Sequence, residues 1–227
     1  MSKATSKGQC HLCHGSFAKT VMTRHLQKCL ASAAAPPRRP ATLKAQKTFY
    51  LLVEGRYEPH YWLHLEAPAA ASLEQLDRFL RGIWLECCGH LSAFTVGGER
   101  YAVSPSRDSF FGDADQSMKK KLYAILSPGL VFEHEYDYGS TTHLKLKVLG
   151  EGEQATGSGK IAILARNDPP EIKCESCAQP ATKVCSGCIY NDPAWYCDAC
   201  AEEHECGEEM MLPVVNSPRV GVCGYTG

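Results

Sequence analysis

The spacing of its cysteines constrains this chain more than any other feature of the sequence. Thirteen cysteines occur among 227 residues, and eight of them form four Cys-x2-Cys pairs. The first residues carry charge without the apolar stretch of a secretory signal, and no run of about 18 apolar residues is long enough to span a membrane. We therefore expect a cytoplasmic protein. Because cytosolic thiols are kept reduced, paired cysteines there predict metal binding rather than disulfides.

The first candidate metal site lies within residues 1–30. Its expected ligands follow the pattern Cys-x2-Cys-x11-His-x3-Cys and are Cys10, Cys13, His25 and Cys29. A Cys-x2-Cys turn presents two thiolates to one ion, and a His and a Cys four residues apart lie on one face of a helix. Phe17 and Met22 fall where ββα zinc fingers keep their small apolar core. The segment resembles a C2HC variant of that finger, and we expect it to hold zinc.

The second cysteine-rich region covers residues 171–227 and has too little apolar content to fold by hydrophobic burial alone. Its candidate ligands are Cys174, Cys177, Cys185, Cys188, Cys197, Cys200, His204 and Cys206, with Cys223 as an alternative to Cys206. Eight ligands suit two tetrahedral zinc ions with no open position, which favours structural over catalytic zinc.

The segment from Trp195 to His204 resembles B-box and MYND modules, in which, as in RING modules, alternate ligand pairs share an ion. The resemblance implies a cross-brace. One ion would be held by Cys174, Cys177, Cys197 and Cys200, and the other by Cys185, Cys188, His204 and either Cys206 or Cys223. With the finger included, we expect about three structural zinc ions in the chain.

A further short motif, Cys87-Cys-Gly-His90, contains two cysteines and a histidine. A fourth metal site is one interpretation of it. We favour the plainer interpretation, in which these are buried small residues that follow a helix, because no second pair of ligands lies nearby in the sequence.

Charge is distributed unevenly along the chain. Residues 1–48 hold nine Lys or Arg and no acidic residue, whereas residues 171–227 hold nine acidic residues and three basic ones. A basic head favours a polyanionic partner at that end, and the candidate nucleic-acid contacts are Lys19, Arg24, Lys28, Arg38 and Arg39. These residues suit phosphate contacts better than base reading, and a finger that docks a protein stays equally open. The acidic C-terminal module favours a protein partner.

Four segments follow from these patterns. We expect a zinc finger at 1–30, a Pro/Ala/basic linker at 31–48, an α+β domain at 49–168 and a double-zinc module at 171–227. Within the central domain, a Ser72–Gln75 capping box predicts a helix start. A second short helix is expected at 118–126, and strands are expected at 49–53, 61–65, 131–138, 141–149 and 161–164. The predicted fold class is an α+β domain with small zinc-stabilised modules at both ends.

The central domain resembles the plasmid pRiA4b ORF-3-like family, a group of mobile-element passenger proteins. The motifs that carry the resemblance are Pro59-His-Tyr-Trp-Leu-His-Leu65, Ser72-Leu-Glu-Gln-Leu76, Trp84, His90-Leu-Ser-Ala-Phe94 and Phe132-Glu-His-Glu-Tyr-Asp-Tyr-Gly139. The family implies a compact α+β domain and no established reaction. This chain keeps Asp137 and Gly139 of the family's motif and has Ser140 in place of its second aspartate.

The residues favour a binding role over catalysis. The sequence contains no nucleophile elbow, no HExxH motif and no glycine loop in the strand-to-helix context that phosphate binding needs. We therefore expect a non-catalytic zinc adaptor whose basic finger contacts nucleic acid or a protein. The alternative is an enzyme with its site near Asp137 and His143, beside Glu133 and Glu135, although a solvated strand face explains these carboxylates more simply.

Overall fold

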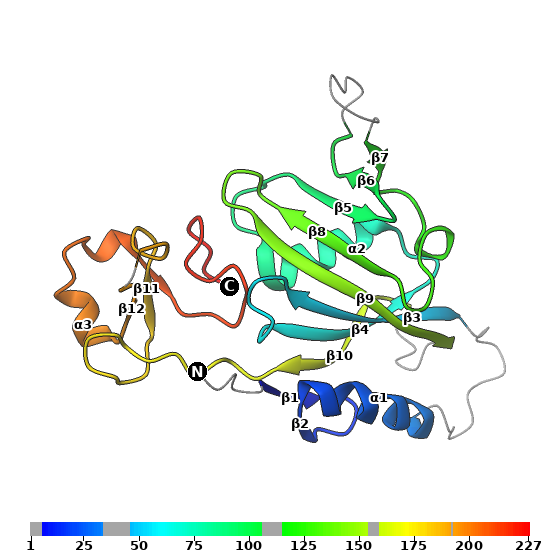
Figure 1. Ribbon diagram of the computed structural model, residues 1–227, viewed down its shortest axis with the longest axis horizontal. Coiled ribbons are helices and arrows are strands. Elements are labelled where there is room, and N and C mark those ends of the chain that lie inside the picture. Colours follow the sequence, from blue (N-terminus) through cyan, green and yellow to red (C-terminus); the bar gives the residue numbers. More distant parts are fainter. Residues whose placement is uncertain (1–5, 34–45, 106–114, 154–158, 192) are drawn as a thin grey trace.

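The computed structural model describes residues 6–33, 46–105, 115–153, 159–191 and 193–227. A ten-stranded sheet dominates this part of the chain, in the strand order β2-β1-β10-β4-β3-β9-β8-β5-β6-β7 (Figure 1). A separate three-stranded sheet, in the order β12-β11-β13, belongs to the C-terminal module. No helix among the described residues is long and apolar enough to cross a membrane.

Alternating side chains build the centre of the large sheet. Its strands here are β3 (Lys47–Gly55), β4 (Trp62–Pro68), β5 (Ser92–Val96), β6 (Glu99–Ala102), β7 (Gln116–Ser117), β8 (Val131–Tyr136) and β9 (Thr142–Glu153). Along β9, Leu144 and Leu146 are buried while Lys145 and Lys147 are exposed, as expected when one face of a strand meets the core. β4 is buried along its whole length. The sheet is therefore covered on both faces at that strand.

One regular helix covers the core face of the central domain. The expected capping box is present at the start of α2 (Leu73–Leu80), where Gln75 N donates to Ser72 Oγ and Ser72 N donates to Gln75 Oε1. Leu73, Leu76 and Leu80 are fully buried against the sheet. A π-helical turn, η1 (Arg81–Leu85), ends the helix and leads directly into the Cys87–His90 loop.

The prediction of a second helix at 118–126 is wrong. The segment contains only a single 3-10 turn, η2 (Leu122–Ala124). Its backbone groups bond elsewhere, because Glu74 N donates to Met118 O and Leu122 N donates to Ala71 O. The segment therefore supports the start of α2 through backbone hydrogen bonds. With one regular helix on a large sheet among its described residues, the central domain is mostly β there, and the expected α+β balance is only partly met.

The sequence led us to expect a finger that is separated from the central domain by a linker. In the structure, the finger is joined to the large sheet. Its elements are β1 (Lys7–Cys10), β2 (Ser16–Ala18) and α1 (Lys19–Ala33). β1 pairs antiparallel with β10 (Ala162–Asn167), so the finger hairpin extends the sheet at one edge (Figure 1). Most of the predicted linker, 34–45, lies outside the described residues.

The C-terminal module lies to one side of the large sheet, at the left in Figure 1, and its tail returns to the central domain. Its elements are β11 (Lys183–Cys185), β12 (Trp195–Tyr196), α3 (Asp198–Glu202), η3 (Glu208–Met210) and β13 (Met211–Pro213). The tail after β13 then lies along the central domain, where Trp84 Nε1 donates to Asn216 O and Ser217 Oγ donates to Trp84 O, at 3.1 Å and 2.6 Å.

Candidate metal centres

All thirteen cysteines are free thiols, and every one of them falls into one of four groups that could hold a metal ion. The groups are Cys10, Cys13, His25 and Cys29; Cys174, Cys177, Cys197 and Cys200; Cys185, Cys188, His204 and Cys206; and Cys87, Cys88, His90 and Cys223. Within each group the four donor atoms lie within 4.8 Å of one another. Each group therefore offers one cation four protein ligands.

The donor spacing suits a tetrahedral ion and not a disulfide. Zinc–sulfur bonds of about 2.3 Å place two tetrahedral sulfur ligands about 3.8 Å apart. The Cys10 and Cys29 sulfurs are 4.0 Å apart, those of Cys177 and Cys197 are 3.6 Å apart, and Cys13 Sγ lies 3.2 Å from His25 Nε2. A disulfide would need about 2.05 Å. Borderline-soft Zn²⁺ matches both the donor types and the spacing.

The finger places its ligands on a hairpin and a helix. Cys10 ends β1, and its N–H donates to Gly15 O at 2.9 Å, which closes the turn that carries Cys13. His25 and Cys29 follow on α1. The ring of Phe17 stacks on that of His25 with 4.1 Å between centroids. The expected ligands and the expected Phe17 core contact thus come together at one point.

The C-terminal module has the alternating arrangement expected from its sequence. The first and third Cys-x2-Cys pairs form one group, and the second pair joins His204 and Cys206 in the other. Cys188 Sγ lies 3.6 Å from both His204 Nε2 and Cys206 Sγ. Cys206 is therefore the fourth member of that group. The alternative, Cys223, lies in a different group altogether.

Crowding of the sulfurs makes a cation favourable. Burial raises the pKa of the Cys174 thiol, but the backbone amides of Cys197, Cys177 and Ser176 outweigh burial and lower that pKa to about 6. Contact with Cys197, and then with Cys177 and Cys174, raises the pKa of Cys200 to about 12. Thiolates so close together repel one another, so all four can be deprotonated together only if a positive ion binds between them.

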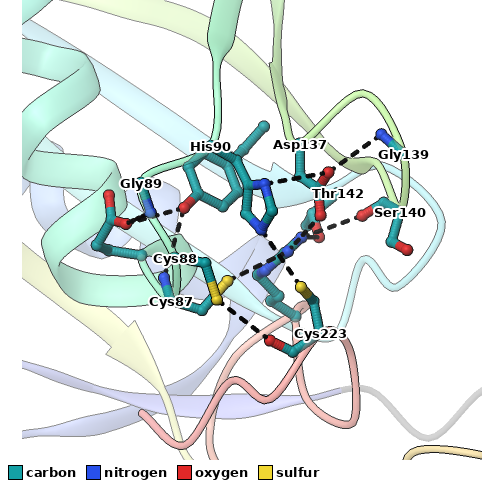
Figure 2. Close-up of polar contacts among 12 residues, drawn as sticks. Cys87, Cys88, Gly89, His90, Asp137, Gly139, Ser140, Thr142 and Cys223 are labelled. Carbon is teal, nitrogen blue, oxygen red and sulfur yellow. Dashed lines mark hydrogen bonds and ion pairs between the residues drawn. The ribbon is translucent and has the colours of Figure 1, made fainter.

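The fourth group corrects our interpretation of Cys87-Cys-Gly-His90 as buried small residues. Cys87 and His90 are only half-buried and Cys88 is exposed, and Cys223 of the C-terminal tail supplies the missing ligand (Figure 2). His90 Nε2 lies 3.3 Å from Cys223 Sγ. A signal for this site existed in the sequence, because the three expected zinc sites leave Cys87, Cys88 and Cys223 as unused thiols beside a histidine.

The expected nucleic-acid contacts are only partly accessible. Lys19 forms an ion pair with Glu54 and donates to Pro59 O, so its charge is used within the molecule. Arg24 and Lys28 are exposed on α1. Arg38 and Arg39 lie outside the described residues.

The carboxylates near His143 are each engaged by an arginine. Asp137 bonds to Arg219 at 2.7 Å, Glu135 bonds to Arg100 at 3.1 Å, and Glu133 pairs with Arg56. Burial raises the pKa of Asp137, but hydrogen bonds from Arg219 and from the backbone of the following turn lower it overall. The lining of a cavity of about 480 Å³ includes Tyr57, Ser140 and His143 but none of these three carboxylates. Glu133 and Glu135 are therefore engaged in ion pairs and do not belong to the cavity lining.

No family model matches the chain, and no curated protein matches it. Among solved structures, the chain is similar to a protein of unknown function from Methanosarcina mazei Go1, with 15% sequence identity and a TM-score of 0.47. The match covers 54% of this chain and 71% of the other. That likeness assigns no function to any residue.

Proposed function

We propose that this chain is a non-catalytic adaptor in which structural zinc ions hold a basic finger and an acidic module on a β-sheet domain. The observation that carries the proposal is the convergence of three complete sets of four Cys and His donors. We assign zinc to these three sets, at the finger and at both groups of the C-terminal module. Thirteen free thiols also favour a reducing compartment such as the cytoplasm.

The C-terminal module supports a structural role for its metals. The buried residues of its own apolar cluster are Cys174, Cys185, Tyr196 and Ala201, so half of them are metal ligands. Such a cluster is too small to fold by burial of apolar surface. Metal binding in small zinc modules supplies the missing free energy, since apparent binding free energies are on the order of 10 kcal/mol per site.

The finger presents two faces with different roles. Met22, Leu26 and Leu30 point inward and are buried against the sheet, whereas Arg24 and Lys28 are exposed. Exposed cations on a helix suit the phosphates of a nucleic acid more than the edges of its bases. We therefore propose that the partner of this face is a nucleic acid, bound with little sequence specificity.

The test measures duplex and single-strand binding by the zinc-loaded chain at two salt concentrations. Arg24→Ala with Lys28→Ala should weaken binding at least severalfold and reduce its dependence on salt. Lys145→Ala with Lys147→Ala removes the same charge from the exposed side of β9 and should leave binding within about twofold. Absence of any binding in the parent protein would rule out a nucleic acid and leave a protein partner for the finger.

We also propose, on its motif residues, that the central domain is related to the pRiA4b ORF-3-like family.

The enzyme alternative retains one supporting observation, the cavity of about 480 Å³ beside His143. A thermal-shift screen of metabolites tests it. A ligand that stabilises the parent protein but not His143→Ala would favour a small-molecule site there, while Leu91→Ala at an exposed position elsewhere serves as control.

A further inference from the structure

We propose that Cys87, Cys88, His90 and Cys223 form a fourth metal centre, for a thiophilic divalent cation such as Zn²⁺, which fastens the C-terminal tail to the central domain. This site is additional to the three zinc sites proposed above and does not depend on any partner. It joins two segments that lie far apart in the sequence, the loop after η1 and the tail (Figure 2).

The backbone is shaped so that neighbouring residues can face one point. Gly89 has a φ of +73°, and its N–H donates to Glu86 Oε1 at 2.7 Å, which holds a tight bend between the two cysteines and His90. Cys223 has a φ of +51°, a left-handed conformation that is strained for a residue with a side chain. Cys88 Sγ also lies 3.8 Å from Cys223 O. The strained conformation of Cys223 directs its thiol toward His90.

The surroundings of His90 match those of a metal-bound histidine. Its Nε2 faces Cys223 Sγ at 3.3 Å, while its Nδ1 faces Asp137 Oδ1 at 3.6 Å (Figure 2). Metal-bound histidines usually turn their second nitrogen toward a carboxylate, which fixes the ring and makes it a better donor. Asp137 is in turn held by Gly139 N at 3.1 Å.

A buried arginine reduces the negative charge of this site. Arg219 is fully buried, and its Nη2 lies 2.7 Å from Asp137 Oδ2 and 3.4 Å from Cys87 Sγ. Its Nη1 donates to Thr142 Oγ1 at 3.0 Å. A buried ion pair is costly to form unless further interactions support it. Three thiolates with one divalent cation would carry a net charge of −1, Asp137 adds a second negative charge, and the guanidinium of Arg219 offsets one of the two.

This centre is more accessible than the other three. Both Cys88 and Cys223 are exposed, whereas each of the other groups contains one fully buried cysteine. Ligands open to water exchange more readily, so this ion is expected to be the first that a chelator removes. The tail up to Arg219 keeps its own hydrogen bonds, and Val220 and Tyr225 are buried, so loss of the ion should loosen the segment around Cys223 between them.

Elemental analysis of the full chain tests the proposal. The parent protein should contain four zinc ions, and His90→Gln and the double variant Cys88→Ser, Cys223→Ser should each contain three. His60→Gln, which changes a half-buried histidine outside all four groups, should retain four. Three ions in the parent protein, or four in both site variants, would overturn the proposal while leaving the other three zinc sites intact.

Thiol labelling of the unaltered protein provides a second test that does not depend on how the variants fold. In the zinc-loaded chain, Cys88 and Cys223 should react with a maleimide at least tenfold more slowly than after mild chelation, as read by peptide mass spectrometry. If both exposed thiols react in the loaded protein as fast as free cysteine, no metal holds them. Substitution of Co²⁺ should add thiolate-to-cobalt absorption that is weaker in His90→Gln.

Discussion

The finger and the C-terminal module both gather four-ligand metal groups, but they are supported very differently. The finger is anchored by β1–β10 pairing and by Met22, Leu26 and Leu30, which pack with Trp62 and Leu164 of the sheet. Val184 and Ala194 of the module are buried in the main core, but the apolar cluster around its metal ligands consists largely of the ligands themselves. Metal is thus one of several supports in the finger and the main support in the module. Groups of four metal ligands can therefore have very different structural consequences in different surroundings.

Removal of all metal should give the largest effect, and it should fall on the module. Two sites at about 10 kcal/mol of apparent binding each exceed the stability of an ordinary domain. Hydrogen exchange after chelation should show complete loss of protection at 174–213, partial retention in α1 and full retention in β3 and β9. Equal loss in the finger and the module would show that both depend on metal to the same extent, and loss in β3 would show that the central sheet itself depends on metal.

Leu26→Ala should loosen the finger even while zinc stays bound. Leu26 is 4 % exposed and sits between α1 and the sheet, so truncation should cost about 2–5 kcal/mol. The exposed neighbour Gln27→Ala should change stability by less than about 0.5 kcal/mol. Local unfolding free energies of α1 from native-state hydrogen exchange provide the measurement. A cost near zero for Leu26→Ala would show that the zinc ion alone holds the finger.

Acid should weaken the contact between α1 and the sheet through His64. Burial, with a smaller effect from the Lys19 charge, lowers the pKa of His64 to about 4, and its Nε2 lies 2.9 Å from Thr23 Oγ1. An unfolded histidine titrates near 6.5, so the unfolded state binds the proton first. The contribution of neutral His64 is therefore complete above about pH 6.5 and is lost as the pH falls toward 4, up to about 3 kcal/mol.

The check compares the parent protein with His64→Gln between pH 7 and pH 4. Protonation of zinc ligands affects both proteins, so the difference between their unfolding free energies isolates His64. That difference should shrink toward acid pH, while the half-exposed His143→Gln should follow the parent curve. A constant difference would mean that His64 is protonated in the folded state as readily as in the unfolded chain.

The smallest expected effect comes from the ion pair between Lys19 and Glu54. Their side chains are 19% and 18% exposed, and the pair links the start of α1 to β3. Lys19→Met should lower thermal stability by the equivalent of about 1 kcal/mol or less, and less still in high salt. Lys28→Met, at an exposed position, provides the control. A loss of several kcal/mol would make this pair a principal anchor of the finger.

Much of the local structure could be predicted because its causes are local. The Ser72–Gln75 capping box marked the start of α2, and the alternating run at 141–149 became the first part of β9. The failure at 118–126 has a physical reason. The apolar residues Met118, Leu122 and Leu126 have helical spacing, but the backbone of this segment bonds to the residues that begin α2. Periodicity does not reveal such competition from tertiary hydrogen bonds.

The ligands of three candidate zinc sites could be predicted from the sequence, because the ligands of each site are close in the chain. A Cys-x2-Cys turn and a helical His-x3-Cys bring donors together through backbone geometry alone, so spacing identifies them as ligands. The alternating grouping in the C-terminal module was implied by its resemblance to B-box and MYND modules, and the structure decided between Cys206 and Cys223. The fourth group could be recognised only in the tertiary structure, because the tail must cross the central domain before Cys223 can lie next to His90. The same is true of the pairing of β1 with β10, since strands about 155 residues apart are matched by the packing of the whole sheet and not by local preference.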